Sequence, residues 1–187
     1  MVDFVNSGTI QGPSSGVSQG LYEESSTQQG DVGAMRELAD GRRFRYSYFV
    51  SATAAGLLVS QDVSATAVVE TNDIVTAADA AATKVTITDS GTLGSATADQ
   101  YAGGYLHTTD DAGEGYTYRI RGNTAASSNA VDFTLYDGLV IAVTTATDVA
   151  ITGSLYGSVH GATAGTDYII SGVTNRVMQA SYYGWVQ

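Results

Sequence analysis

The chain has 187 residues, no cysteine and a formal net charge of −11, with only eight lysine and arginine residues. The lack of cysteine excludes disulfides, thiolate metal sites and thiol nucleophiles, and the acidic balance argues against general attraction to nucleic acid or anionic lipid. No apolar run reaches the roughly 18–20 residues that span a bilayer, and the first residues lack the basic flank of a signal peptide, so we expect neither nucleic-acid nor membrane partners.

Residues 1–33 differ in composition from the rest of the chain. They are rich in Gly, Ser and Gln and contain the only proline, Pro13, a composition that does not bury enough apolar area to fold alone. Apolar side chains nevertheless recur along this segment, at Phe4, Val5, Ile10, Val17, Leu21 and Tyr22. We therefore predict an extended N-terminal arm over residues 1–33 that docks on another subunit. The alternatives are a tail or an arm that folds back on its own domain.

A β-domain is predicted over residues 34–187. Residues 31–38 have the composition for one or two helical turns. Residues 42–50 then read RRFRYSYFV, with Phe44, Tyr46 and Tyr48 on one side of a strand and Arg43 and Arg45 on the other.

The same alternation of apolar and polar residues recurs downstream, at residues 84–89, 115–122 and 131–136. Shorter strands are predicted at residues 57–60, 67–70, 105–108, 139–143, 149–152, 155–159, 167–170 and 183–186. The alanine-rich residues 76–83 have the composition for a single helical turn. Many short strands separated by turn residues predict an all-β sandwich or barrel of antiparallel strands.

The sequence offers little catalytic chemistry. The two histidines, His107 and His160, are far apart and lack metal-ligand spacing. Residues 12–16 match G-x-S-x-G, but they lie in the arm with a proline inside the motif and no strand before it. The carboxylates of residues 110–114 have the chemistry for calcium, but they lack the spacing of an EF-hand and a polar turn explains them better. We therefore predict a non-enzymatic protein with no catalytic residues, no cofactor and no metal.

Arginine and aromatic residues mark the predicted contact surfaces. On strands, the pairs Arg43/Arg45 and Arg119/Arg121 each project two guanidinium groups on one face, which suits ion pairs across a subunit contact. Local pairing on a solvated face is the alternative. Tyrosine and tryptophan are favoured at interfaces, and they crowd the C-terminus. The predicted partner-contact residues are Phe4, Val5, Ile10, Leu21, Tyr22, Arg43, Arg45, Arg119, Arg121, Tyr183 and Trp185.

Several blocks of the sequence resemble virion structural proteins of tailed bacteriophages. They are RELADGRRFRY at residues 36–46, YAGGYL with GEGYTYRI at 101–106 and 113–120, TLYD at 134–137 and YYGWVQ at 182–187. The resemblance implies the role of a capsid decoration, or cement, protein. Such proteins bind the outer face of a shell, commonly as trimers, and bridge major capsid subunits. No catalytic residues come with this resemblance.

The expectation that follows is a homotrimer on the capsid surface, assembled in the host cytoplasm, with the major capsid protein as its partner. Deleting residues 1–33 is expected to leave the β-domain folded and to weaken binding to the shell. The alternative is a tail-tube, head-fibre or adsorption protein of the virion, the last of which would bind a host glycan through exposed aromatic rings.

Overall fold

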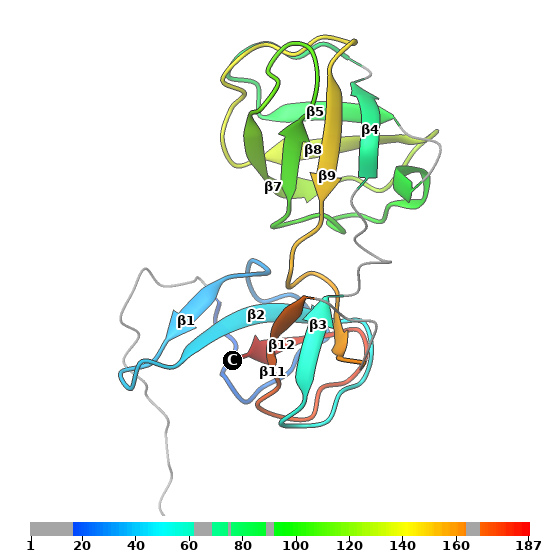
Figure 1. Cartoon of the computed structure of the whole chain (residues 1–187). Helices are drawn as coiled ribbons and strands as arrows, with labels where there is room; N and C mark the ends of the chain where they lie inside the picture. Colours follow the sequence, from blue (N-terminus) through cyan, green and yellow to red (C-terminus); the bar gives the residue numbers. More distant parts are fainter. Residues whose placement is uncertain (1–16, 62–68, 75, 89–91, 164–168) are drawn as a thin grey trace, which may run out of the picture. The chain divides into compact units, whose positions relative to one another are not determined.

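The regular structure of the chain is almost entirely β, which confirms the predicted fold class (Figure 1). The computed structural model describes residues 17–61, 69–74, 76–88, 92–163 and 169–187, and these ranges contain twelve strands and one short 3-10 helix. Contacts divide the chain into two units: unit 1 comprises Met1–Ser60 and Val159–Gln187, and unit 2 comprises Gln61–Ser158. Where the sequence suggested an arm followed by one domain over residues 34–187, the chain has two β-units, the second inserted within the first.

Six strands build unit 1. They are β1 (Met35–Glu37), β2 (Arg43–Phe49), β3 (Leu58–Gln61), β10 (Val159–Gly161), β11 (Ile170–Val173) and β12 (Tyr182–Val186). The sheet runs in the order β1-β2-β10-β3-β11, and β12 also pairs with β2. Val173, the last residue of β11, exchanges two backbone hydrogen bonds with Gln187, of 2.8 and 2.9 Å. The end of β12 therefore meets β11, and the sheet curls round on itself.

Strand β1 occupies the stretch for which the composition suggested helical turns. Met35 pairs with Arg45 of β2 in an antiparallel register. The side chains follow a period of two: Val32 and Leu38 are buried, and Arg36 lies over the ring of Trp185, 4.4 Å from its centroid. Alternate residues thus face one layer of the core, which is the geometry of a strand and not of a helix.

Strand β2 is buried on both of its faces. Phe44 and Tyr46 belong to a core cluster that also contains Trp185, while Ser47 and Phe49 are fully buried as well. The predicted alternation therefore holds only as far as Tyr46. The segment that precedes β1 packs on the face of Phe44 and Tyr46, since Val17 and Leu21 belong to the same cluster, whereas Ser47 and Phe49 are buried on the opposite face.

That segment is the described part of the predicted arm, residues 17–33, and it folds back on its own unit. Val17, Leu21 and Val32 are buried in unit 1. The backbone of Ser25 exchanges hydrogen bonds with Tyr183 of β12, at 3.1 and 2.8 Å. Of the readings that the sequence left open, the structure therefore shows, for residues 17–33, a segment that covers its own domain.

Unit 2 is a closed antiparallel barrel. Its strands are β4 (Val69–Ile74), β5 (Lys84–Thr88), β6 (Tyr105–Thr108), β7 (Thr117–Asn123), β8 (Ala130–Leu135) and β9 (Asp148–Thr152), and the helix η1 spans Thr92–Ser95. They close in the order β4-β5-β8-β7-β6-β9. Inward-facing residues that alternate along the strands fill the interior; among them are Val85, Ile87, Leu106, Tyr118, Ile120, Val131, Phe133, Leu135, Val149 and Ile151.

Three predicted elements of this region differ from the structure. Residues 139–143 contain no strand: only Val143 makes a β-bridge, to Ala78, while Val140 is exposed. Residues 76–83 form a turn and not a helix, with Ala81 at a φ of 69°. In the stretch 155–159, the strand begins only at Val159.

Candidate functional site

Two of the predicted contact residues are part of the core. Leu21 and Trp185 are 7% and 0% exposed, and both belong to the cluster behind β2. Tyr183 is half-buried, with its ring 6.0 Å from that of Tyr46 and 4.8 Å from that of Tyr48. These side chains therefore hold the segment 17–33 against the sheet, and the surfaces of Leu21 and Trp185 are not available to a partner. Phe4, Val5 and Ile10 lie outside the described residues.

The polar contacts of this buried layer converge on Gln19. Its side-chain amide donates to the carbonyls of Glu23 and Tyr183 at 2.8 and 2.9 Å, and its Oε1 accepts from the Tyr46 hydroxyl at 2.7 Å. Burial raises the pKa of Tyr46, so the hydroxyl stays protonated as the donor of that bond. The indole of Trp185 donates to the carbonyl of Gln19 at 3.1 Å.

The arginines of β2 are engaged within unit 1. Arg43 forms an ion pair of 2.8 Å with Glu37, and Arg45 donates to the carbonyl of Gly33 at 2.8 Å. Nearby, Tyr22 is half exposed and its carbonyl accepts a hydrogen bond from Arg176 at 2.6 Å. These contacts match the alternative of local pairing on the strand face.

The arginines of β7 are placed differently. Arg119 and Arg121 are exposed and point outward from the barrel. The Arg119 guanidinium lies 4.9 Å from the centroid of the Tyr136 ring. In the part of the chain that the structure describes, neither guanidinium group makes a hydrogen bond or an ion pair. Unit 2 therefore presents two unpaired cations side by side on one strand.

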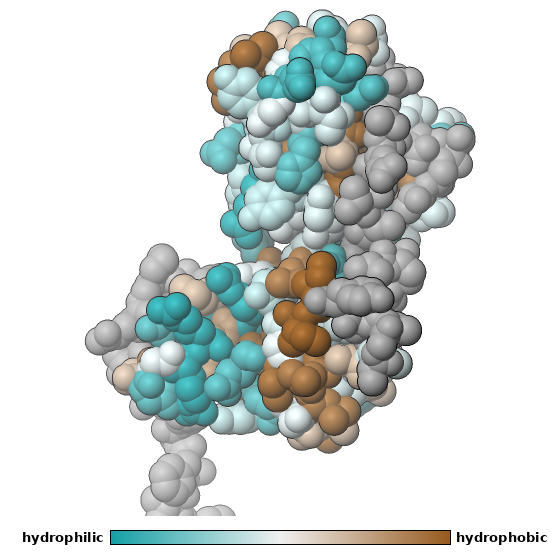
Figure 2. All heavy atoms as spheres, in the orientation of Figure 1, coloured by the Kyte–Doolittle hydropathy of each residue, from teal (hydrophilic) through white to brown (hydrophobic). Residues whose placement is uncertain are grey.

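Unit 1 carries a contiguous set of exposed apolar side chains, which we call the apolar strip. It consists of Leu57, Leu58, Ile169, Ile170, Val173 and Val177, which are between 36% and 59% exposed. Leu58 of β3 and Val173 of β11 are direct cross-strand partners, and Figure 2 shows the apolar surface gathered over these two strands. Single exposed apolar residues are ordinary, whereas a contiguous patch marks a candidate contact surface.

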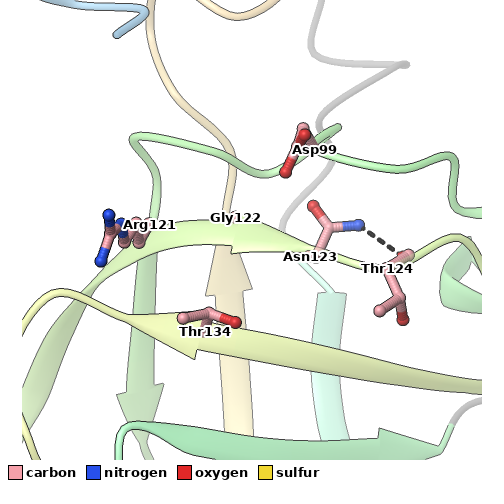
Figure 3. A pocket seen from close by; sticks show the side chains of 6 residues that line it. All are labelled: Asp99, Arg121, Gly122, Asn123, Thr124 and Thr134. Atoms are coloured by element: carbon pink, nitrogen blue, oxygen red, sulfur yellow. Dashed lines mark hydrogen bonds between the residues drawn. The ribbon is translucent and has the colours of Figure 1, made fainter.

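Unit 2 has a pocket of about 340 Å³ that Arg121 helps to line (Figure 3). The lining residues are Asp99, Arg121, Gly122, Asn123, Thr124 and Thr134. Arg121 is the additional residue of a β-bulge, because Ile120 pairs with Leu135 while Gly122 pairs with the very next residue of β8, Thr134. A bulge redirects the side chain that it carries, and here that side chain is the guanidinium at the pocket.

The backbone around the pocket is held in an unusual conformation. Asp99 has a φ of 58°, in the left-handed region that few residues other than glycine adopt. A Cβ atom at Gly122 would lie 2.5 Å from Oδ1 of Asp99, so the glycine allows the Asp99 carboxylate to approach this strand closely. Asn123 fixes the loop: it accepts from the Tyr101 amide at 2.8 Å and donates to the Thr97 carbonyl at 2.9 Å.

The pocket combines one guanidinium, one carboxylate and two threonine hydroxyls, which are groups that bind polar ligands by hydrogen bonds and charge. The sequence singled out Arg121 and placed Gly122 at the end of the strand pattern of residues 115–122, whereas β7 extends to Asn123. A Gly inside a strand pattern indicates a bulge or a close backbone approach, and this is the signal that points to the site. Nothing in the local sequence points to Asp99.

Neither histidine forms part of a metal site in the described ranges, which contain no group of three or more His, Asp or Glu side chains placed to hold a metal ion. The two ring nitrogens of His107 contact the hydroxyls of Thr117 and Thr152 at 3.0 and 3.3 Å. Asp111 accepts a hydrogen bond from the Thr144 hydroxyl at 2.8 Å, which lowers the pKa of its carboxyl.

No helix within the described residues is long and apolar enough to cross a membrane. Comparison of the chain with protein-family models, with curated protein sequences and with solved structures finds no match.

Proposed function

We propose that this chain is a non-enzymatic structural protein of a tailed-phage virion. In this proposal it is a decoration protein that binds the outer face of the capsid as a homotrimer and bridges major capsid subunits. The sequence blocks that resemble phage virion proteins suggest the setting, and the apolar strip on β3 and β11 is the observation that carries the proposal. Its place of action is the capsid surface, and assembly takes place in the host cytoplasm.

The apolar strip is the proposed contact between copies of the chain. A patch of six such side chains offers on the order of a few hundred Å² of apolar surface. A stable interface buries about 800 Å² on each partner, so the strip forms the apolar centre of the contact and polar residues around it complete the area. A closed ring of three copies multiplies weak contacts with the shell, which raises avidity without new chemistry.

The N-terminal residues are the proposed contact with the capsid. Val17 is buried, and its carbonyl accepts a hydrogen bond from Arg36 at 2.7 Å, so the segment before it begins from a fixed point on unit 1. Sixteen residues reach about 50 Å when fully extended. Phe4, Val5 and Ile10 are the apolar side chains that this segment brings to a neighbouring capsid subunit.

The test combines the mass of the purified protein in solution with sedimentation on capsids that lack it. We expect a trimer that sediments with the capsids and raises the temperature at which they are disrupted. The double variant Leu58→Asp/Val173→Asp should give monomers with reduced capsid binding. The matched control is Val140→Asp, since Val140 is an equally exposed apolar residue of unit 2, at 60%, and should leave the trimer intact.

A monomer or a hexamer that does not bind capsids would contradict the proposal and would favour a tail-tube, head-fibre or adsorption role. A trimer that both variants leave unchanged would remove the apolar strip as the subunit contact.

A further inference from the structure

We propose that the pocket of unit 2 and the aromatic surface beside it bind an anionic oligosaccharide. This inference is independent of the decoration role, because it rests on residues of β6, β7 and β8 and not on the apolar strip. The ligand class is a chain of sugars that carries carboxylate groups, such as a uronate or a sialoside.

The two unpaired guanidinium groups select for an anion. Arg119 and Arg121 lie two positions apart on the outer face of β7, in a chain whose net charge is −11. Like charges this close on one face repel each other, and neither is neutralised by a neighbouring carboxylate in the described structure. The planar fork of arginine binds a carboxylate through two parallel hydrogen bonds, so an incoming carboxylate supplies the missing partner.

The carboxylate of Asp99 indicates which other groups the ligand carries. Figure 3 shows Asp99 and Arg121 apart from each other, on either side of Gly122. A ligand therefore meets a hydrogen-bond acceptor at one side and a cation at the other. Hydroxyl groups of a sugar donate well to a carboxylate, whereas the phosphodiester backbone of DNA presents only acceptor oxygens to it. This arrangement favours a sugar acid over a nucleic acid.

Exposed rings extend the site beyond the pocket. Tyr105 of β6 is the direct cross-strand partner of Arg119, and the Arg119 guanidinium in turn covers the Tyr136 ring. Tyr105 and Tyr136 are 45% and 38% exposed. Tyrosine presents an apolar ring face with a hydrogen-bonding tip, which matches the apolar C–H face and hydroxyl edge of a pyranose.

The site is pre-organised. The bulge at Arg121, the left-handed Asp99 and the three hydrogen bonds of the Asn123 side chain, of 2.8, 2.9 and 2.9 Å, fix the lining before any ligand arrives. Such rigidity reduces the entropic cost of binding. The volume of about 340 Å³ is at the lower end for small-ligand pockets, so the pocket holds one sugar unit. The two tyrosines, which both adjoin Arg119, accept the next units of the sugar chain.

The experiment titrates the full-length protein with tetragalacturonate and sialyllactose, and with their neutral counterparts maltotetraose and lactose, by calorimetry and by amide chemical shifts. We expect at least one acidic ligand to bind and the neutral ligands to bind at least tenfold more weakly. Arg121→Gln should reduce affinity for the acidic ligand at least tenfold. Tyr136→Ala should reduce it several-fold and leave its dependence on salt unchanged.

Arg43→Gln is the matched control, because Arg43 is an exposed arginine of unit 1 and should leave sugar binding unchanged. The Leu58→Asp/Val173→Asp variant should bind the sugar as the wild type does, which separates this inference from the decoration role. Failure of both acidic oligosaccharides to bind would overturn the proposal. So would binding that Arg121→Gln leaves intact, or a tetraglutamate peptide that binds this surface as tightly as the sugars.

Discussion

At the scale of single residues, Gln19 illustrates why a polar side chain is retained in an apolar layer. A glutamine amide is both a donor and an acceptor, and Gln19 uses both functions on Glu23, Tyr183 and Tyr46. Each buried group that loses its partner costs about 1–3 kcal/mol. The side chain therefore links the N-terminal segment to β2 and β12 through hydrogen bonds in a largely buried layer.

Replacement of this side chain should loosen unit 1. We expect Gln19→Ala to lower the unfolding free energy of unit 1 by about 2–3 kcal/mol, because the Tyr46 hydroxyl and the Tyr183 carbonyl lose a partner in a buried layer. The measurement is denaturant unfolding followed by the emission of Trp185, the only tryptophan. Gln29→Ala is the control, since Gln29 is exposed. An equal loss in both variants would contradict the prediction.

Asp132 supports a prediction about pH. Lys84 and the Thr86 hydroxyl contact its carboxylate at 2.7 and 2.6 Å, and these two hydrogen bonds, that of Lys84 first, lower its pKa. Because the pKa is lowered in the folded state, the ionised carboxylate stabilises unit 2 at pH values above about 3.9, the ordinary pKa of an aspartate. That contribution is lost as the pH falls through the lowered value.

The matching experiment compares the melting temperature of unit 2 in the wild type and in Asp132→Asn across the pH range. The wild type should be the more stable above about pH 5, and the difference should shrink as the pH falls toward about 3. Asp137→Asn, at an exposed turn position after β8, serves as the control and should follow the wild type. A difference that stays constant with pH would show that the carboxylate charge is not responsible.

At the scale of elements, the segment 17–33 changes the expected result of truncation. The sequence suggested that removal of residues 1–33 leaves the β-domain folded. Because Val17, Leu21 and Val32 are buried and Gln19 is bonded to β2 and β12, this deletion instead exposes the ring of Trp185. We expect the 1–33 deletion to shift the Trp185 emission to longer wavelength and to lower the stability of unit 1 by several kcal/mol.

Deletion of residues 1–16 alone is the control, because it leaves that layer in place. It should keep the wild-type emission and stability while it weakens binding to the capsid. Wild-type stability of the 1–33 deletion would show that the layer contributes little. Loss of stability on removal of residues 1–16 would assign them a part in folding.

The elements that the sequence predicted well are those with clear alternation. Residues 84–89 and 131–136 coincide closely with β5 and β8, because every second side chain fills the barrel. The run LVIAV at 139–143 has the composition of a strand but no alternation, and in it Leu139 and Val143 are buried while Val140 and Ile141 are exposed. An apolar run alone does not distinguish a strand from a turn that buries two of its side chains in the core.

The candidate site was predictable only in part, for a related reason. The spacing of Arg119 and Arg121 on a strand is visible in the sequence and places both outside the barrel. The bulge at Arg121 arises in the pairing of β7 with β8, and Asp99, in the loop before β6, donates its backbone amide to the Asn123 carbonyl of β7 at 2.8 Å. Contacts of that kind are set by tertiary packing, which local propensity does not encode.

At the scale of the whole molecule, the insertion of unit 2 leaves little trace in composition. The chain leaves unit 1 along β3 and returns along β10, and these two strands are hydrogen-bonded neighbours in one sheet. Ala162 donates to the carbonyl of Leu58 at 2.9 Å. Short strands with similar residues flank the boundary on both sides, so the sequence read as one continuous series of strands.

This arrangement predicts that unit 1 folds without unit 2. Because β3 and β10 are adjacent, a two-residue Asn-Gly turn in place of residues 62–158 should restore the connection. The shortened protein should keep the wild-type emission of Trp185 and unfold cooperatively, since its core cluster comes entirely from residues outside the insertion. Residues 61–158, expressed alone, should give the near-ultraviolet signal of ordered tyrosines. An emission maximum of exposed tryptophan in the shortened protein would show that unit 1 requires the inserted barrel to fold.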